Sequence, residues 1–306
     1  MTRSRRRNYQ LNCEALESRQ PLSGFYIVNA ASGKVLDDPN FSTSNRAPIQ
    51  QFQLNGGANQ RWNLVRMKNG NFEVVNAFSG KVLDDPNFST SNGTQIIQFQ
   101  PNGGLNQQWR FVPLANGNFE IFNAFSGKVL DNPAFITSSN GNPIEQEPLN
   151  GGATQQWILV AAANAPVVNN FVENAFSGKV LDDPGFSTSN GTLIQQFQFN
   201  GGANQQWLFV PLVDGNVLIV NASSGEVLDD PNFSTSNGTH IQQFQLNGGL
   251  NQRWHVVPLA NGNYEVFNAS SGKVLDDPNF STSNGTLIIQ FQLNGGLNQQ
   301  WKLLPA

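Results

Sequence analysis

Short hydrophobic runs alternate along the chain with clusters of turn-forming residues. Runs rich in Val, Ile and Phe are separated by Asn-Gly, Gly-Gly and Asp-Pro pairs, a pattern typical of strands joined by tight turns. Nothing along the chain shows helical periodicity. Four kinds of run recur, exemplified by residues 49–53 (IQQFQ), 72–77 (FEVVNA), 81–84 (KVLD) and 107–114 (QQWRFVPL). The sequence therefore predicts an all-β protein.

The runs belong to a repeat that ends each time at a tryptophan. Successive tryptophans are separated by 47, 48, 50, 47 and 47 residues, at Trp62, Trp109, Trp157, Trp207, Trp254 and Trp301. Each copy reads approximately NA-x-SGKVLDDPNFSTSNGT-x-IQQFQ-x-NGG-x-NQQW. A fixed period of this length indicates a fold built from repeated units.

Irregular spacing divides the six copies into two groups of three. The distance from a tryptophan to the next SGKV serine is 17 residues, except between copies three and four, where it is 20. The extra residues lie in AAANAPVVNN, which has the composition of a linker. We expect a first domain at 24–162, a linker at 163–169 and a second domain at 170–306.

Three copies of four strands predict one β-trefoil, a closed six-stranded barrel capped by three hairpins. The chain would thus hold two tandem β-trefoil domains. A six-bladed propeller is the alternative, because propeller blades also have four strands and a similar length. A single ring gives no reason for a linker at its midpoint, so the spacing favours the trefoils.

Composition narrows the function classes. The 306 residues include 12% charged and 38% hydrophobic residues, and the net charge is -4. A chain with 17 Lys and Arg against 21 Asp and Glu lacks the basic surface that nucleic acids require. The single cysteine, Cys13, excludes an intrachain disulfide, and no apolar run is long enough for a membrane span. No cofactor is expected.

The end of each copy resembles a known family. The Gln-x-Trp ending, the preceding SGKxLD run and the NGGxNQxW spacing are similar to those of ricin-B-type β-trefoil lectins. The resemblance covers about residues 24–306. It implies a β-trefoil fold and non-catalytic binding of glycans, galactose-type or other neutral sugars. It says nothing of oligomeric state.

The resemblance also implies a set of roles, which we transfer position by position. In copy one, Asp37 would be the sugar-binding carboxylate, Phe52 the stacking aromatic, Gln50 and Asn59 the hydroxyl-binding amides, and Gln60 a supporting amide. The equivalent sets in copies four and five are Asp182, Gln195, Phe197, Asn204 and Gln205, and Asp229, Gln242, Phe244, Asn251 and Gln252. The family usually has Trp or Tyr at the position of these phenylalanines.

The other three copies depart from this set. Copies two and six keep Asp84, Phe99, Asn106 and Gln107, and Asp276, Phe291, Asn298 and Gln299, but carry Ile97 and Ile289 at the strand amide. They are expected to bind differently or more weakly. Copy three keeps Asp131 and Gln155 but has Glu147 and Thr154 in place of the aromatic and the Asn. Its site is expected to be inactive.

Strand parity supports one face for the site. Ile49 and Phe52 are three residues apart and point to opposite faces of an extended strand, as do the adjacent Leu36 and Asp37. With Ile49 and Leu36 in the core, Phe52 and Asp37 share the outer face. A sugar needs such an aromatic surface together with short polar groups for its hydroxyls.

Structural roles are the alternative to binding at several positions. The tryptophans are expected in the core, and Phe41 and its equivalents are expected to anchor a hairpin or the core. Asp37 could cap the Asp-Pro bend, and Asp38 is assigned wholly to that role. The IQQF phenylalanines could simply pack.

The residues do not predict an enzyme. The consecutive Asp37 and Asp38 diverge on a strand, whereas glycosidases need two acids facing across a sugar. His240 and His255 are not repeated and suggest neither a triad nor a zinc site. Alternatives to a lectin are a structural or protein-interaction module without sugar binding, and a carbohydrate-targeting module that works with a separate enzyme.

Residues 1–23 stand apart as a basic, polar tail that we expect to be disordered. Residues 16–23 (LESRQPLS) resemble a bacterial N-terminal motif, L-E-P-R-x-L-L-S, associated with exported or surface proteins. That resemblance implies a possible targeting role and an extracytoplasmic, secreted or cell-surface location.

Overall fold

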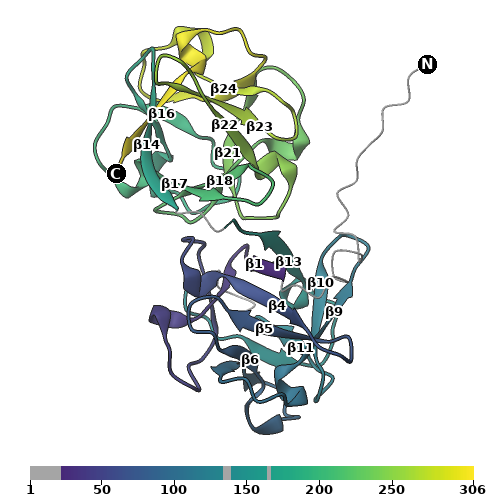
Figure 1. Ribbon diagram of the computed structural model, residues 1–306. Helices are drawn as coiled ribbons and strands as arrows, with labels where there is room; N and C mark the ends of the chain where they lie inside the picture. The colour runs from purple at the N-terminus through teal and green to yellow at the C-terminus, as the bar shows by residue number, and fades with distance from the viewer. Residues whose placement is uncertain (1–21, 134–138, 164–166) are drawn as a thin grey trace, which may run out of the picture.

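A computed structural model describes residues 22–133, 139–163 and 167–306, and these residues form two β-sheets (Figure 1). The sheets contain 13 and 14 strands and follow one another along the chain. Most of the predicted tail, with Cys13 and most of the targeting motif, and residues 164–166 of the predicted linker lie outside the described residues. Strand β1 begins at Leu22, two residues before the predicted start of the first domain.

The first sheet contains the strands of copies one to three, which we call repeats 1 to 3. Its strands are β1 (Leu22–Asn29), β2 (Val35–Asp37), β3 (Gln50–Phe52), β4 (Trp62–Arg66), β5 (Phe72–Asn76), β6 (Val82–Asp84), β7 (Thr94–Gln95), β8 (Ile97–Phe99), β9 (Trp109–Pro113), β10 (Phe119–Asn123), β11 (Val129–Asp131), β12 (Glu145–Glu147) and β13 (Trp157–Ala161).

The second sheet contains the strands of repeats 4 to 6. Its strands are β14 (Val168–Asn174), β15 (Val180–Asp182), β16 (Gln195–Phe197), β17 (Gln206–Pro211), β18 (Val217–Asn221), β19 (Val227–Asp229), β20 (Thr239–His240), β21 (Gln242–Phe244), β22 (Trp254–Pro258), β23 (Tyr264–Asn268), β24 (Val274–Asp276), β25 (Thr286–Leu287), β26 (Ile289–Phe291) and β27 (Trp301–Pro305).

Two kinds of 3-10 turn interrupt the strands. The first follows the paired aspartates at η2 (Pro39–Phe41), η4 (Pro86–Phe88), η7 (Pro184–Phe186), η9 (Pro231–Phe233) and η11 (Pro278–Phe280). The second precedes each tryptophan strand at η3 (Ala58–Gln60), η5 (Leu105–Gln107), η6 (Ala153–Gln155), η8 (Ala203–Gln205), η10 (Leu250–Gln252) and η12 (Leu297–Gln299).

Each sheet closes on itself as a six-stranded barrel. In the first, antiparallel pairs run from β1 through β4, β5, β9, β10 and β13 back to β1. The hairpins β2/β3, β6/β8 and β11/β12 extend from this barrel and pair with one another at one end. The second sheet repeats the arrangement. The predicted all-β fold of two tandem β-trefoils is thereby confirmed.

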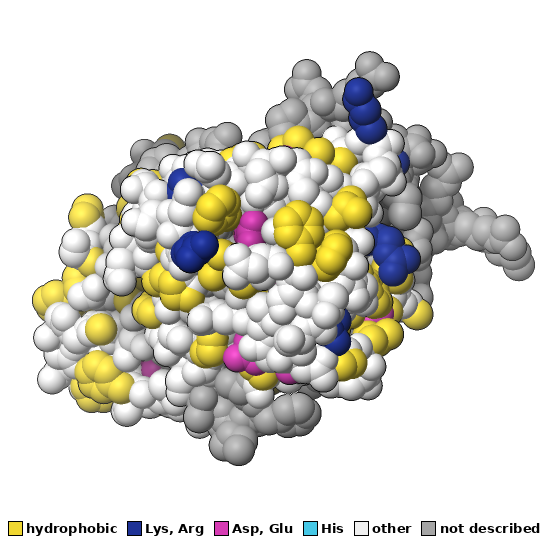
Figure 2. Space-filling model, turned by 90° about the horizontal axis from the view of Figure 1, so that it is seen from below, with side chains coloured by type: hydrophobic (Ala, Val, Ile, Leu, Met, Phe, Trp, Pro, Cys, Tyr) yellow, Lys and Arg dark blue, Asp and Glu magenta, His cyan; other side chains and the backbone are white. Residues whose placement is uncertain are grey.

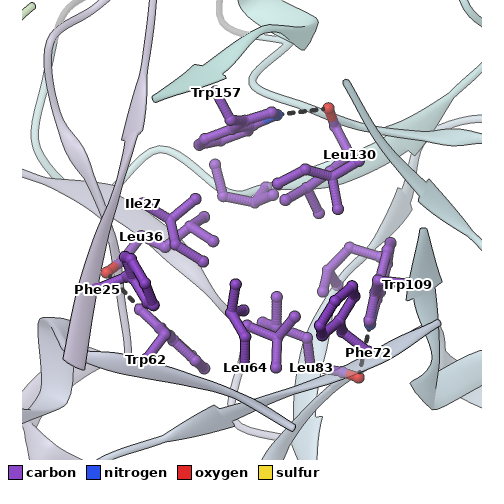
Figure 3. Packing of buried hydrophobic residues seen from close by; sticks show 14 of the residues in the cluster. Phe25, Ile27, Leu36, Trp62, Leu64, Phe72, Leu83, Trp109, Leu130 and Trp157 are labelled. Carbon is purple, nitrogen blue, oxygen red and sulfur yellow. Dashed lines mark hydrogen bonds between the residues drawn. The ribbon is translucent and has the colours of Figure 1, made fainter. Parts of the chain in front are cut away.

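The tryptophans lie in the centres of the barrels, as predicted. Trp62, Trp109 and Trp157 are completely buried with a leucine and an isoleucine from each repeat (Figure 3). Each indole N–H donates to a leucine carbonyl of the same repeat, as Trp62 does to Leu36 at 3.0 Å. A buried indole thus has its polar atom satisfied, and the bond fixes the residue immediately before Asp37.

The two trefoils pack together through repeats 1 and 5 and through the strands β13 and β17 beside them. A separate apolar cluster joins them, in which Val28, Val35 and Leu54 of repeat 1 meet their equivalents in repeat 5. At the rim, a Cβ on Gly33 would lie 2.6 Å from the Cβ of Gln245, so this glycine allows a close approach. In Figure 1 the sheets are stacked with β1 and β13 facing β17 and β18.

Candidate functional site

The predicted site residues of repeat 1 meet around the carboxylate of Asp37. Gln50 donates its Nε2 hydrogen to Oδ1 of Asp37 at 2.7 Å. Asn59 and Gln60 donate to Oδ2 at 2.9 and 3.0 Å. The antiparallel register places Asp37 directly opposite Gln50 on adjacent strands, and η3 presents the other two amides. Three amides therefore hold one buried carboxylate.

Local chain features hold the two amides of η3 in place. Asn59 also donates to the carbonyl of Asp38, and Gln60 donates to the carbonyl of Gln53. A Cβ on Gly57 would lie 2.4 Å from Oδ1 of Asn59, so only glycine gives the Asn59 side chain its space. The NGGxNQ spacing thus encodes the position of the two amides.

Phe52 shares the face of Asp37, as parity predicts. Phe52 pairs with Val35 in the same register that pairs Asp37 with Gln50, and its side chain is half-buried. Asp37 itself is only 3% exposed because the amides cover it. The carboxylate therefore lies on the predicted side of the strand but beneath the surface. On the face shown in Figure 2, acidic side chains surface only as small patches among other residues.

Repeats 4 and 5 reproduce the whole arrangement. In both, three amides donate to the two oxygens of one aspartate at 2.7–3.0 Å, and a half-buried phenylalanine shares its face. The residues brought together are Asp182, Gln195, Phe197, Asn204 and Gln205, and Asp229, Gln242, Phe244, Asn251 and Gln252.

Repeats 2 and 6 leave one carboxylate oxygen open. Ile97 stands opposite Asp84 in the register and offers no donor. Asn106 and Gln107 both donate to Oδ2 of Asp84, at 3.2 and 2.7 Å. Phe99 is half-buried beside them. Repeat 6 has the same arrangement, with Asp276, Ile289, Phe291, Asn298 and Gln299.

Repeat 3 has lost the arrangement. Gln155 still donates to Oδ2 of Asp131 at 2.7 Å, but Oδ1 and the hydroxyl of Thr154 are buried without a partner. Glu147 replaces the aromatic, and Glu145 faces Asp131 at the position of the strand amide. Burial raises the pKa of Glu145, and so do the charges of Glu147 and Asp131. In repeat 3, carboxylates therefore occupy the face that carries a phenylalanine in the other repeats.

Phe41 and its equivalents do not lie in the core, which corrects that half of the sequence prediction. Their side chains are 45–55% exposed in the five repeats that the structure describes at this position. The backbone has a positive φ at Phe41, Phe88, Phe186, Phe233 and Phe280. This conformation costs a bulky residue about 1–2 kcal/mol, and such strain is concentrated at functional sites.

In repeat 2 this phenylalanine borders the site. Asp84, Phe88, Ile97, Phe99 and Asn106 line one cavity of about 150 Å³. Its remaining walls are Pro86, Asn87, Asn102 and Arg46. Phe88 also meets Phe125 edge to face, with ring centroids 5.0 Å apart. A second aromatic side chain thus faces the space beside Phe99. The recurrence of a phenylalanine in the PNF segments could have indicated this role. The sequence does not show the backbone bend that turns the ring outward.

A loop from the preceding repeat overhangs each site. The β2–β3 loop supplies Arg46 to the repeat 2 cavity. At the equivalent loop position of repeat 3, a Cβ on Gly141 would lie 3.7 Å from Oε1 of Gln50 in repeat 1. In the second trefoil, a Cβ on Gly191 would lie at the same distance from Oε1 of Gln242. Each site is therefore built from two repeats, and no local pattern in the sequence indicates this.

Asp38 does not cap the Asp-Pro bend, contrary to the sequence prediction. It precedes η2, but its side chain makes no capping hydrogen bond, and it is completely buried. Burial, together with the charge of Asp37, raises the pKa of Asp38 to about 7. Its neighbour across the repeat boundary is Gln98, so Asp38 faces repeat 2 whereas Asp37 faces its own amides.

Electrostatics in the site follow from burial. Desolvation raises the pKa of Asp37, and the hydrogen bonds from Gln50, Gln60 and Asn59 oppose that rise. The pKa values of the Asp84, Asp229 and Asp276 carboxylates are raised for the same reason.

Within the described ranges, no three His, Cys, Asp or Glu residues gather so that they could hold a metal ion. None of the described helices is long and apolar enough to cross a membrane.

Comparison with known proteins assigns the chain to a family. The sequence model described as "Ricin-type beta-trefoil lectin domain-like" matches residues 9–99, 105–172, 169–244 and 250–306. The chain therefore belongs to the ricin-type β-trefoil lectin-like family, in agreement with the resemblance of its Gln-x-Trp repeats. A comparison with curated proteins gave no match.

Several solved structures are similar to parts of the chain. The designed threefold-symmetric protein ThreeFoil is 43% identical and matches 45% of this chain and 99% of its own, with a TM-score of 0.45. The Rhizoctonia solani agglutinin is 24% identical over 48% of this chain and 100% of its own, with a TM-score of 0.42. A Macrolepiota procera ricin B-like lectin, solved with lactose, is 22% identical over 45% and 95%, with a TM-score of 0.39.

Proposed function

We propose that this protein is a lectin that binds glycans without catalysis, through one shallow site in each repeat except repeat 3. The observation that supports this most directly is the recurrence of one arrangement. In five repeats, an aspartate held by Asn and Gln amides lies on the same face as a half-buried phenylalanine. Membership of the ricin-type family supports the same conclusion.

The chemistry of the arrangement suits hydroxyl-rich ligands. A carboxylate accepts hydrogen bonds from neighbouring sugar hydroxyls, amides both donate and accept, and an aromatic ring covers the apolar side of a pyranose. Repeats 1, 4 and 5 offer an aspartate whose two oxygens are already held by amides, so a ligand would share these bonds. Several weak sites on one chain would retain a multivalent glycan surface more strongly than any single site.

A glycan array tests the proposal, with the aromatic residues as the control. Wild type is expected to be retained on a subset of glycans. A variant with Phe52, Phe99, Phe197, Phe244 and Phe291 all changed to Ala should lose that retention while keeping its circular dichroism spectrum. These half-buried rings are better targets than the aspartates, which hold the amides in place. Absence of binding by the wild type at high density would disprove the lectin function.

A structural or protein-interaction module is the second candidate. The exposed phenylalanines of the PNF turns support it, because Phe41 and Phe78, 5.0 Å apart, form an apolar edge that a protein partner could cover. Such a module would be expected to bind a partner protein with equal strength after the glycans of that partner are removed. The same array, printed with deglycosylated glycoproteins, separates the two functions.

A further inference from the structure

The repeat 2 site contains an arginine, supplied by the loop of repeat 1, that has no equivalent at the other sites. Arg46 lies in the β2–β3 loop of repeat 1, is exposed, and lines the cavity together with Asp84, Phe88 and Phe99. Glycine stands at the equivalent loop position of every other repeat, namely Gly93, Gly141, Gly191, Gly238 and Gly285. The arginine therefore distinguishes this one site from the others.

The backbone gains nothing from an arginine at this position. Arg46 has φ of 68°, in the left-handed region that favours glycine. Its N–H donates to the carbonyl of Gln98 at 2.8 Å, and Gly238 makes the same bond to Gln290 at 2.9 Å. Over the described residues, no ion pair or side-chain hydrogen bond holds the guanidinium. A strained residue with an unpaired charge at the edge of a cavity points to a ligand.

The rest of the cavity fixes where that ligand would lie. Oδ1 of Asp84 receives no amide, because Ile97 replaces the donor that Gln50 supplies in repeat 1. A ligand hydroxyl can donate to this oxygen directly. Phe88 and Phe99 line the same space, whose volume of about 150 Å³ suits a single sugar ring. An anionic group on that ring would meet Arg46.

We propose that the repeat 2 site selects a sugar that carries a carboxylate, a hexuronic acid, whereas the other sites take neutral sugars. One ring hydroxyl donates to Oδ1 of Asp84, and the carboxylate pairs with the guanidinium of Arg46. Arginine suits this task because its planar donors match a carboxylate. This inference rests on the proposed lectin function and adds a ligand class to one of its sites.

Repeat 6 provides a matched control site. Repeats 2 and 6 are identical from the SGKV serine to the tryptophan except at two positions, where Gln95 and Pro101 stand against Leu287 and Leu293. The loop of repeat 5 that overhangs the repeat 6 site carries Gly238, and a Cβ there would meet no atom within 4 Å. The Gly238→Arg substitution should therefore transfer the property of repeat 2 to repeat 6.

The test compares matched sugars at the two sites in the full-length chain. Galactose, glucose and mannose are titrated against galacturonic, glucuronic and mannuronic acids, and the side-chain amide signals of Asn106 and Asn298 are followed by NMR. In the wild type, Asn106 should respond to one uronic acid at a concentration about tenfold lower than to its neutral counterpart. Asn298 should show no such preference.

Two substitutions then assign the preference. Arg46→Gly restores the residue of the other repeats and relieves the backbone, so it should remove the preference at Asn106 while the fold is kept. Gly238→Arg should create the preference at Asn298. If Asn106 prefers no uronic acid, or if Arg46→Gly leaves the preference unchanged, the inference is wrong even where neutral sugars bind. If none of the six sugars shifts a signal of any repeat, the lectin function fails as well.

Discussion

Asn132 donates its Nδ2 hydrogen to Oε1 of Gln51 at 2.7 Å, across the boundary between repeats 3 and 1. The equivalent residue in repeat 1 is Asp38, which faces Gln98 of repeat 2. The side-chain amide of Gln98 is held in one orientation, because its Oε1 accepts from Ser79 and its Nε2 donates to the carbonyl of Ser42. Both carboxylate oxygens of Asp38 are buried without a hydrogen-bond partner, so burial favours its protonated form although Gln98 lowers its pKa, whereas Asn132 is neutral at every pH and donates to its glutamine.

We therefore expect Asp38→Asn to stabilise the protein at neutral pH. Burial raises the pKa of Asp38 to about 7 in the fold, above the value of about 3.9 in an unfolded chain. The stabilisation from the protonated acid is complete below about pH 4 and is lost as the pH rises through 7. Asn should gain at least about 1 kcal/mol at pH 8, measured by urea unfolding, and close to nothing at pH 4.

The reverse substitution is the control. Asn132→Asp should lower the unfolding free energy at pH 8 and have little effect at pH 4, because it places a carboxylate against Gln51. Asp85, Asp183, Asp230 and Asp277 have pKa values of about 7 for the same reason, so the wild type should lose thermal stability between pH 5 and 8. A flat stability profile over this range would contradict the protonated state.

A second prediction concerns the junction of the two trefoils. Lys34 and Glu226 occupy the same position in repeats 1 and 5, and every other repeat has lysine there. Burial lowers the pKa of Lys34, and the charge of Glu226 opposes that shift. Burial raises the pKa of Glu226 to about 7, and the charge of Lys34 opposes that rise. Glu226→Lys should cost about 1–2 kcal/mol and loosen the junction, seen as a larger radius of gyration in X-ray scattering.

Exchanging both charges is the control for that prediction. The double variant Lys34→Glu and Glu226→Lys should recover most of the loss, since it restores opposite charges. Lys81→Glu changes the equivalent residue of repeat 2, and it should leave the radius of gyration unchanged. If the double variant remains as loose as Glu226→Lys, the two residues do not act on one another.

A third prediction concerns the strained phenylalanine of repeat 2. Phe88→Gly removes a ring that lines the cavity, and it also removes the strain of a positive φ. These effects on stability oppose one another, so the melting temperature should change little. Glycan affinity at this site should fall about fivefold, measured by NMR titration of Asn106. Phe125→Leu, which changes the ring beside Phe88 but not the cavity lining, should keep the affinity.

The sequence predicts the barrel and one half of the site because both depend on local signals. Alternation and Asn-Gly turns define the strands, and parity alone places Asp37 and Phe52 on one face. The remaining features depend on contacts between repeats. Asp38 is buried by a glutamine of the next repeat, and Arg46 reaches a site 38 residues further along the chain. The bend that exposes Phe41 depends on a backbone angle that its residue type disfavours.

A fourth prediction concerns the aspartates themselves. Asp37→Ala removes the carboxylate that accepts from Gln50, Asn59 and Gln60. One amide hydrogen of each then loses its acceptor. We expect a loss of about 1–3 kcal/mol, so any loss of glycan binding in this variant would mix two causes. Asp131→Ala is the matched control, because this aspartate accepts from one amide and has one buried oxygen without a partner. Its unfolding free energy should stay within about 0.5 kcal/mol of wild type, because the substitution also removes a carboxylate that lies beside Glu145. Equal losses from the two substitutions in urea unfolding would show that the amide network contributes no stability.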